Sequence, residues 1–314
     1  MTYSLEPFRG IFPAALTMFD ENEELDEEST AKHWDWLIRQ GVQGLVITGT
    51  SGEFIALKDE ERLRLFKLAK SVVAGRVPVI YGTGHYSTKL TIEFSEAAVK
   101  ESADAVIIIL PYYQKPPKPA VVRHFRDVRA RINVPIMLYN NPANSACADL
   151  DPQEVARLVE EDVVHLVKST YETVVPVHDL SYLVGDKMAI FYGSFMAAFE
   201  GFTAGAHGWT SGILNVVPKA AIALHRACVL ENDARKGFEI WKKILDVVHI
   251  WKYQKIGPVS DLAIYRSILK AWGLPGGYCR HPFYALDEEQ ERSINRILRE
   301  TGWIDPDQVL AGLV

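Results

Sequence analysis

The chain has 314 residues, of which 48% are hydrophobic and 24% charged, and its formal net charge is −6. This balance predicts a globular protein with a sizeable core and excludes a largely disordered chain. The sequence has no long basic run, which argues against nucleic acid as a partner because phosphate binding needs a positive surface.

The cysteines and the N-terminus bear on the compartment. Cys147, Cys228 and Cys279 are far apart and form no metal-ligand pattern, which predicts free thiols in a reducing compartment. The first ten residues lack the basic and then apolar pattern of a signal segment, and the longest apolar run, 105–110, is too short to span a bilayer. We therefore expect a cytoplasmic protein without a membrane partner.

Short apolar runs alternate with stretches of helical periodicity through the first 230 residues. The predicted strands are 10–19, 44–49, 78–84, 103–111, 134–140, 163–170, 188–194 and 206–212. The predicted helices are 27–40, 58–73, 88–101, 118–131, 151–160, 173–184, 195–204 and 217–230. Strands that each return through a helix are parallel. Doubly wound and closed sheets both fit this alternation, but eight units favour the closed (β/α)8 TIM barrel, and no GxGxxG follows the first strand.

The alternation ends at residue 230. Residues 232–253, 260–272 and 287–301 are predicted helices, separated by turn signals such as Gly257-Pro258. No low-complexity linker precedes them. We therefore predict a catalytic barrel over residues 1–230 and a C-terminal helical extension, residues 231–314, that packs on it.

The stretch Gly-Thr-Ser-Gly-Glu-Phe, residues 49–54, joins the second predicted strand to the next helix. Glycines let backbone N–H groups approach a ligand, and hydroxyls form hydrogen bonds without adding charge. An ordinary strand-to-helix loop with a capping Ser and Glu fits the same residues. This stretch alone does not decide between the two interpretations.

In a barrel of this kind the active site lies at the carboxyl ends of the strands. Lys168 lies near the end of the mostly apolar strand 163–170, and Tyr139 ends the neighbouring strand. Burial disfavours a charged amine, and a neutral lysine attacks carbonyl carbons to form Schiff bases. A lysine that extends to water at the barrel mouth, or pairs with a carboxylate, also fits. The Tyr139 phenol could pass protons to a carbinolamine, or could only plug the barrel top.

Several motifs occur together along the barrel. They are Gly49-Thr50-Ser51-Gly52-Glu53, Pro111-Tyr112-Tyr113, Tyr139-Asn140-x-Pro142 and Val167-Lys168. In this order and spacing they resemble the dihydrodipicolinate synthase / N-acetylneuraminate lyase family, whose members are pyruvate-linked class I lyases and aldolases on a TIM barrel. The resemblance extends over nearly the whole chain, helical tail included.

The resemblance implies roles for the matching residues. Lys168 would form the imine with the 2-oxo group of a 2-oxo acid, and Tyr139 would shuttle protons. Gly49, Thr50 and Ser51 would bind the substrate carboxylate, and Ser51 would also relay protons to Tyr139.

Two further roles are implied by the family. Tyr113 would reach across a dimer interface to complete the neighbour's proton relay, in a homotetramer built as a dimer of dimers. The backbone of Thr210 would line the imine site. The resemblance implies no cofactor.

The chain departs from the family where a second substrate would bind. Synthases that form dihydrodipicolinate carry an arginine two residues after the Tyr-Asn-x-Pro proline, and this chain has Asn144 there. An amide cannot make the bidentate ionic contact that arginine makes with a carboxylate. The sequence 142–144, Pro-Ala-Asn, instead resembles the 4-hydroxy-2-oxoglutarate aldolase branch. The seventh strand lacks the family's Gly-Asp-Asp and the eighth carries Trp209, so we expect a less acidic, more aromatic distal pocket.

These observations predict a lyase that cleaves a 2-oxo acid, such as a 4-hydroxy-2-oxoglutarate-like compound, into an aldehyde and pyruvate or a close relative. Two alternatives stay open. The same imine could remove a 4-substituent, as in a dehydratase or deaminase of a 3-deoxy-2-oxo sugar acid or a hydroxylated pyrroline carboxylate. A non-catalytic 2-oxo-acid sensor is the third hypothesis. We expect no metal, because no His/Asp/Glu cluster marks the strand ends.

Overall fold

The computed structural model describes residues 3–146 and 149–310. Its strands are β1 (Gly10–Ile11), β2 (Leu45–Ile47), β3 (Val79–Gly82), β4 (Ala105–Ile109), β5 (Ile136–Asn140), β6 (Leu166–Ser169), β7 (Ala189–Tyr192) and β8 (Gly208–Trp209). They form one parallel sheet in the order β1-β8-β7-β6-β5-β4-β3-β2. A parallel bridge between Ala14 and Val46 links the chain after β1 to β2 and closes the ring.

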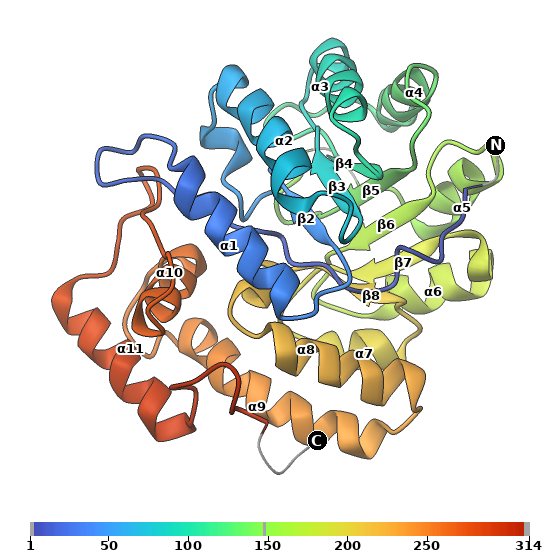
Figure 1. The fold of residues 1–314 in the computed structure, drawn as a ribbon. Coiled ribbons are helices and arrows are strands. Elements are labelled where there is room, and N and C mark those ends of the chain that lie inside the picture. The colour runs from blue at the N-terminus through green and yellow to red at the C-terminus, as the bar shows by residue number, and fades with distance from the viewer. Residues whose placement is uncertain (1–2, 147–148, 311–314) are drawn as a thin grey trace.

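A helix follows each strand and covers the outside of the sheet (Figure 1). The helices are α1 (Glu27–Arg39), α2 (Asp59–Val73), α3 (Thr88–Lys100), α4 (Lys118–Arg129), α5 (Pro152–Glu160), α6 (Val175–Val184), α7 (Ala198–Thr203) and α8 (Pro218–His225). The shorter turns are the 3-10 helices η1 (Phe54–Ala56), η2 (Gly185–Lys187) and η3 (Gly212–Asn215) and the π-helical turn η4 (Arg226–Leu230). The predicted (β/α)8 TIM barrel is confirmed.

Side-chain caps fix where several helices begin. Asp26 accepts a hydrogen bond from Ser29 N at the start of α1, and Ser87 accepts one from Leu90 N at the start of α3. Removing a cap of this type typically costs ~1 kcal/mol. These caps place the loops that precede the helices, and those loops form the upper rim of the barrel.

The strands bury both faces. One set of side chains fills the inside of the ring, including Val46, Ile80, Ile107, Met137, Leu166 and Phe191. The alternate positions pack against the helices, including Ile47, Tyr81, Ile108, Leu138, Val167 and Ile190. Burial on both faces explains why the strands appear in the sequence as continuous apolar runs. The centre is a packed core, so a ligand site belongs at one end of the barrel.

All eight strands are shorter than the runs that the sequence predicts, and the first and last differ most. The run 10–19 gives only β1, although the backbone N–H groups of Phe12 and Ala14 still donate to Trp209 O and Ser211 O. The run 206–212 gives only the two residues of β8, after which the chain turns into η3. The predicted helix 217–230 also divides into α8 and the π-helical turn η4.

Three helices follow the barrel: α9 (Ala234–Lys252), α10 (Asp261–Ala271) and α11 (Glu288–Thr301). In Figure 1, where they are orange to red, α9 lies along α8 and α10 lies beside α11. These helices form the predicted extension, although the domain boundary at residue 230 stays a prediction. Among residues 3–146 and 149–310, no helix is long and apolar enough to cross a membrane.

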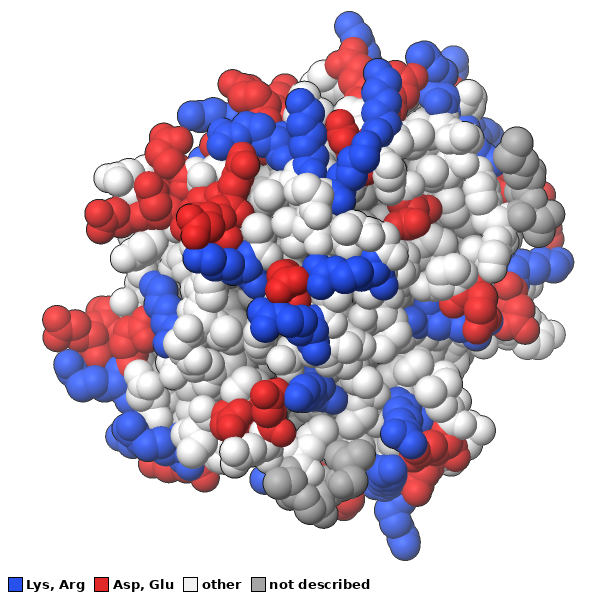
Figure 2. Space-filling model, in the orientation of Figure 1, with Lys and Arg blue, Asp and Glu red and all other residues white. Residues whose placement is uncertain are grey.

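Lys and Arg side chains alternate with Asp and Glu over the face shown in Figure 2. Some surface charges pair along one helix, as Lys32 does with Glu28 on α1. Cys228 and Cys279 are free, buried thiols, as predicted, and Cys147 lies outside the described residues.

Candidate active site

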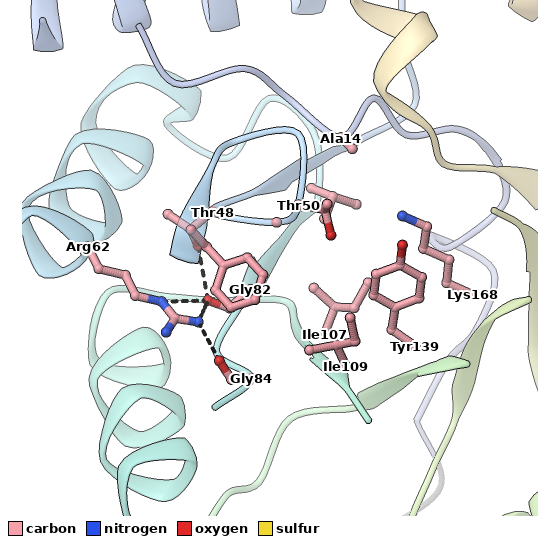
Figure 3. Close-up of a pocket in the computed structure, with 13 residues that line it drawn as sticks. Ala14, Thr48, Thr50, Arg62, Gly82, Gly84, Ile107, Ile109, Tyr139 and Lys168 are labelled. Carbon is pink, nitrogen blue, oxygen red and sulfur yellow. Dashed lines mark hydrogen bonds between the residues drawn. The ribbon is translucent and has the colours of Figure 1, made fainter. Parts of the chain in front are cut away.

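Lys168 and Tyr139 lie side by side at the carboxyl ends of β6 and β5. The sheet register pairs them directly, and each is 6% exposed. Lys168 Nζ lies 4.0 Å from the centroid of the Tyr139 ring. Both side chains extend with their polar ends toward Thr50 (Figure 3). The structure therefore brings together the two residues that the sequence singled out, while their catalytic roles stay a prediction.

The surroundings of Tyr139 favour its ionised form. Burial acts to raise the pKa of this phenol, but the Lys168 charge and hydrogen bonds with Asn141, Thr50 and Lys168 outweigh burial. The pKa of Tyr139 therefore lies below its ordinary value of 10.0. Asn141 Nδ2 donates to the phenol oxygen over 2.8 Å. A phenol with a lowered pKa can give up and take back a proton, as an acid–base catalyst must.

Gly193, at the end of β7, leaves space for the lysine. A Cβ atom at this position would lie 2.8 Å from Lys168 Cγ and 3.1 Å from Lys168 Cε. Real Cβ atoms do not approach other carbons so closely, so only glycine fits without displacing the lysine. From the sequence, the end of the seventh strand was notable only because it lacks the family's Gly-Asp-Asp.

The turn 49–54 is held in a strained conformation beside these residues. Thr48, just before the turn, and Glu53, within it, have positive φ angles of 48° and 55°. Such conformations cost on the order of 1–3 kcal/mol each at non-glycine residues and persist only where the surroundings hold them. Thr48 Oγ1 donates to Gly82 O over 3.0 Å, which anchors the start of the turn to β3.

The turn directs its two hydroxyls to different places. Thr50 lines a pocket with Lys168 and forms a hydrogen bond with Tyr139. Ser51 Oγ lies beside Gly212 instead, where a Cβ atom on the glycine would approach it to 2.6 Å. The proton relay assigned to Ser51 stays a prediction, and Thr50 has the contact that a relay to Tyr139 needs.

A small cavity of about 20 Å³ lies beside Lys168 and opens to the surface. Ile107 and Ile109 give it an apolar wall, and Gly49 and Thr50 supply polar groups near the lysine. A pocket with apolar walls and a few converging polar groups suits a small organic molecule.

Arg62, on α2, is a pocket residue that sequence analysis missed. It is 4% exposed and donates to Gly82 O from Nε over 3.1 Å and from Nη2 over 2.6 Å (Figure 3). Its guanidinium carbon lies 4.3 Å from the centroid of the Phe94 ring. Burial lowers the pKa of Arg62 to about 10, so it stays charged at neutral pH. In the sequence, burial of Arg62 was indicated only by its place on the same helical face as Leu65 and Phe66, which are also buried.

Besides Ser51, three predicted site residues are not among those that line this pocket. Tyr113 is 91% exposed in the loop after β4 and has a positive φ of 72°. Asn144 is exposed in the turn after β5, where its backbone N–H donates to Asn141 O over 3.1 Å. Thr210 is fully buried, and its backbone N–H donates to Tyr192 O over 3.0 Å.

No group of three or more His, Cys, Asp or Glu side chains in residues 3–146 and 149–310 is arranged to hold a metal ion. The Lys168 amine, the Tyr139 phenol and the Thr50 hydroxyl are the polar side-chain groups that meet at this site. A buried lysine beside a tyrosine at the ends of neighbouring barrel strands defines the class of Schiff-base-forming lyases.

Comparison with known proteins identifies the family within that class. Residues 7–301 match the model of the Dihydrodipicolinate synthetase family, and the chain belongs to this family. It is 32% identical over 298 residues to the 4-hydroxy-tetrahydrodipicolinate synthase of Methanocaldococcus jannaschii, covering 95% of this chain and 100% of that protein. It is 35% identical over 297 residues to the synthase of the same name from Pelobacter propionicus, with the same two coverages.

The fold is also similar to solved structures. The crystal structure of YagE, a prophage protein of the same family from E. coli K12 in complex with pyruvate, matches with a TM-score of 0.86 at 28% identity. The match covers 94% of this chain and 99% of that one. The family resemblance is confirmed, and the protein is a class I Schiff-base lyase.

Proposed function

We propose that this lyase cleaves a 4-hydroxy-2-oxo acid into an aldehyde and pyruvate, or a close relative of pyruvate, with Lys168 as the imine lysine. The observation that carries the proposal is the contact between Lys168 and Tyr139, both buried beside one pocket. Pyruvate bound to the related YagE supports a pyruvate-like core for the substrate.

The residues provide each step of this chemistry. Lys168 gives a proton to the Tyr139 phenolate and attacks the C2 carbonyl as the free amine. Tyr139 then returns the proton to the hydroxyl, which leaves as water and gives a protonated imine. The imine withdraws the electron pair of the C3–C4 bond while the Tyr139 phenolate takes the proton of the C4 hydroxyl. The aldehyde then leaves, and an enamine stays on Lys168. Protonation at C3 and hydrolysis release pyruvate and the free amine.

The turn 49–54 supplies the carboxylate site in this proposal. Neutral N–H and hydroxyl donors in a tight turn can hold an anion. Gly49, Thr50 and Ser51 bind the substrate carboxylate, and Thr50 also passes protons to and from Tyr139 through its hydrogen bond. Tyr113 is directed away from its own barrel and completes the relay of a partner subunit, in a dimer of dimers.

Asn144 supports a substrate other than aspartate semialdehyde. The relatives named above are 4-hydroxy-tetrahydrodipicolinate synthases. This chain has an exposed amide at position 144, where the synthases of the family carry an arginine. We therefore place the substrate among 4-hydroxy-2-oxo acids, with 4-hydroxy-2-oxoglutarate as the first compound to test.

Borohydride trapping across a panel of 2-oxo acids tests the proposal. A substrate should leave one reduced adduct, which peptide mapping should place on Lys168, and Lys168→Met should abolish it. Lys270→Met is the matched control, because Lys270 Nζ also lies over a tyrosine ring, 4.4 Å from the centroid of Tyr278, but on α10. Its labelling should equal that of the wild type. An adduct on another lysine would overturn the assignment.

Product analysis separates the reaction types. Pyruvate and an aldehyde in equal amounts support aldol cleavage. A dioxo acid would show dehydration or deamination on the same imine, and trapping without turnover would show a sensor. Either result would overturn the proposed cleavage while keeping the imine.

A further inference from the structure

Glu53 follows Gly52 in the turn 49–54, and its carboxylate is buried. Its side chain is 2% exposed, and that of its partner Arg266, on α10, is 3% exposed. Arg266 Nη2 donates to Glu53 Oε1 over 2.5 Å, although the two residues are 213 positions apart in the sequence. The backbone N–H of Arg280 donates to Glu53 Oε2 over 2.9 Å. Residues from the C-terminal extension therefore hold both carboxylate oxygens.

Arg266 is itself fixed in one orientation. Besides Glu53, its guanidinium donates to Thr17 O over 2.7 Å and to Gly276 O over 2.9 Å. Its remaining contacts are to sulfur atoms, Met18 Sδ at 3.1 Å and Cys279 Sγ at 3.2 Å. All five N–H groups thus have partners, and a planar guanidinium bound in this way cannot rotate without losing several of them.

The position of Glu53 determines that of Thr50. The backbone N–H of Glu53 donates to Thr50 O over 3.0 Å, which closes the turn between them. Glu53 also has the left-handed φ of 55°, a conformation that needs an external constraint. Its buried ion pair with Arg266 supplies that constraint, and Thr50 carries the hydroxyl that bonds to Tyr139.

We propose that Glu53 and Arg266 are positioning residues for the lyase reaction, and that the C-terminal extension acts through them to keep Thr50 in contact with Tyr139. This inference rests on the proposed function. An ion pair with a structural role alone would change stability when it is broken. A positioning pair must also change the step that Tyr139 performs, because removing one partner leaves a buried charge unpaired and the turn must rearrange.

The test compares Glu53→Gln and Arg266→Lys with the wild type. Glu53→Gln keeps the shape of the side chain but removes its charge. We expect kcat to fall by about 10- to 100-fold, since the proton transfers of Tyr139 lose their relay, and KM to change by less than about threefold. Arg266→Lys keeps the charge but loses the planar fork. Its kcat should therefore lie between that of the wild type and that of Glu53→Gln. Tyrosinate absorbance should show Tyr139 ionising at a higher pH in both variants, because the Thr50 hydrogen bond is lost.

Ser267→Ala is the matched control. Ser267 is the next residue on α10, is 1% exposed, and its hydroxyl bonds to Glu291 of α11 rather than to the turn. This variant should lower Tm while leaving kcat and the Tyr139 titration unchanged. If Glu53→Gln and Arg266→Lys also lower Tm but leave kcat and the Tyr139 titration unchanged, the inference is wrong. Should Glu53→Gln fail to fold, Arg266→Lys decides by the same measurements.

Failure of the proposed function would be seen separately. Absence of a borohydride adduct on wild-type Lys168 would overturn the function, whereas the Tyr139 titration needs no substrate. That titration would still show whether the ion pair holds Thr50 against Tyr139.

Discussion

The amine of Lys168 lies 4.0 Å from the centre of the Tyr139 ring, at the same level of two neighbouring strands. The positive charge of Lys168 stabilises the phenolate form of Tyr139, so a change at the lysine should alter the ionisation of the tyrosine. The lysine and its hydrogen bond with the phenol are among the contacts that hold the pKa of Tyr139 below 10.0.

Lys168→Met should therefore raise the pKa of Tyr139. Burial of the phenol remains in this variant, while the charge that opposes it is gone. Tyrosinate absorbance, followed as pH is raised, should show one tyrosine ionising later than in the wild type. Tyr139→Phe identifies that tyrosine, because its titration should disappear. An unchanged titration in Lys168→Met would mean that the lysine does not stabilise the phenolate.

The two hydroxyls of the turn should have separable effects. Thr50 contacts Tyr139, so Thr50→Val should lower kcat by about tenfold or more through loss of the proton relay. Ser51 lies toward Gly212 and keeps its backbone N–H when mutated, so Ser51→Ala should raise KM a few-fold and change kcat by less than about threefold. Steady-state kinetics of both variants test this. A large loss of kcat in Ser51→Ala with little loss in Thr50→Val would mean that Ser51 is the proton relay.

Wild-type protein should not condense pyruvate with aspartate semialdehyde. Asn144 cannot form the bidentate pair that arginine makes with a carboxylate, and losing such a pair costs a few kcal/mol, or roughly two decades in affinity. A coupled reductase assay measures the condensation. Asn144→Arg is the informative variant, since the residue is exposed and its hydrogen bond to Asn141 uses only the backbone. Rapid condensation by the wild type would refute the prediction.

Acid should destabilise the protein between about pH 6.5 and 4 through its buried histidines. Burial lowers the pKa of His33 to about 4, against a hydrogen bond to Asn215 that acts to raise it. The unfolded chain binds a proton at His33 in this window and the folded chain does not, so stability is lost as pH falls. The difference between the pKa of folded His33 and that of an ordinary histidine corresponds to roughly 3 kcal/mol at most. Denaturant unfolding at several pH values should show a slope that His33→Gln reduces by about one proton.

The sequence predicted the parts of the site that depend on periodicity and strand order. Runs buried on both faces gave the eight strands, and parallel strands must end at one edge, so Lys168 and Tyr139 were expected together. The parts of the site that the sequence could not predict depend on backbone torsion angles and on contacts between residues far apart in the chain. The positive φ angles around the turn decide which hydroxyl faces the pocket, and no local pattern predicts them. Arg266 meets Glu53 only because α10 folds back over the barrel.

The exposed loop after β4 provides the last prediction. Tyr113 is 91% exposed with a φ of 72°, so the strained backbone directs a large aromatic side chain away from its own barrel. Aromatic residues with a polar tip are enriched at subunit interfaces. Tyr113→Phe alone should therefore lower kcat, and Tyr182→Phe, a 90% exposed tyrosine on α6, should not. A tyrosine that serves its partner should also be complemented by a subunit that lacks a different catalytic group.

Mixing Tyr113→Phe with Lys168→Ala subunits tests this exchange. In a two-fold dimer, the site that keeps Lys168 receives a native Tyr113 from its partner, while the other site carries both defects. Half of randomly exchanged dimers are mixed and each has one intact site, so activity should recover to about a quarter of the wild-type value. The Tyr182→Phe subunit mixed with Lys168→Ala controls for dilution. If subunits exchange, as native mass spectrometry can verify, and activity does not recover, Tyr113 serves its own barrel or has no part in the reaction.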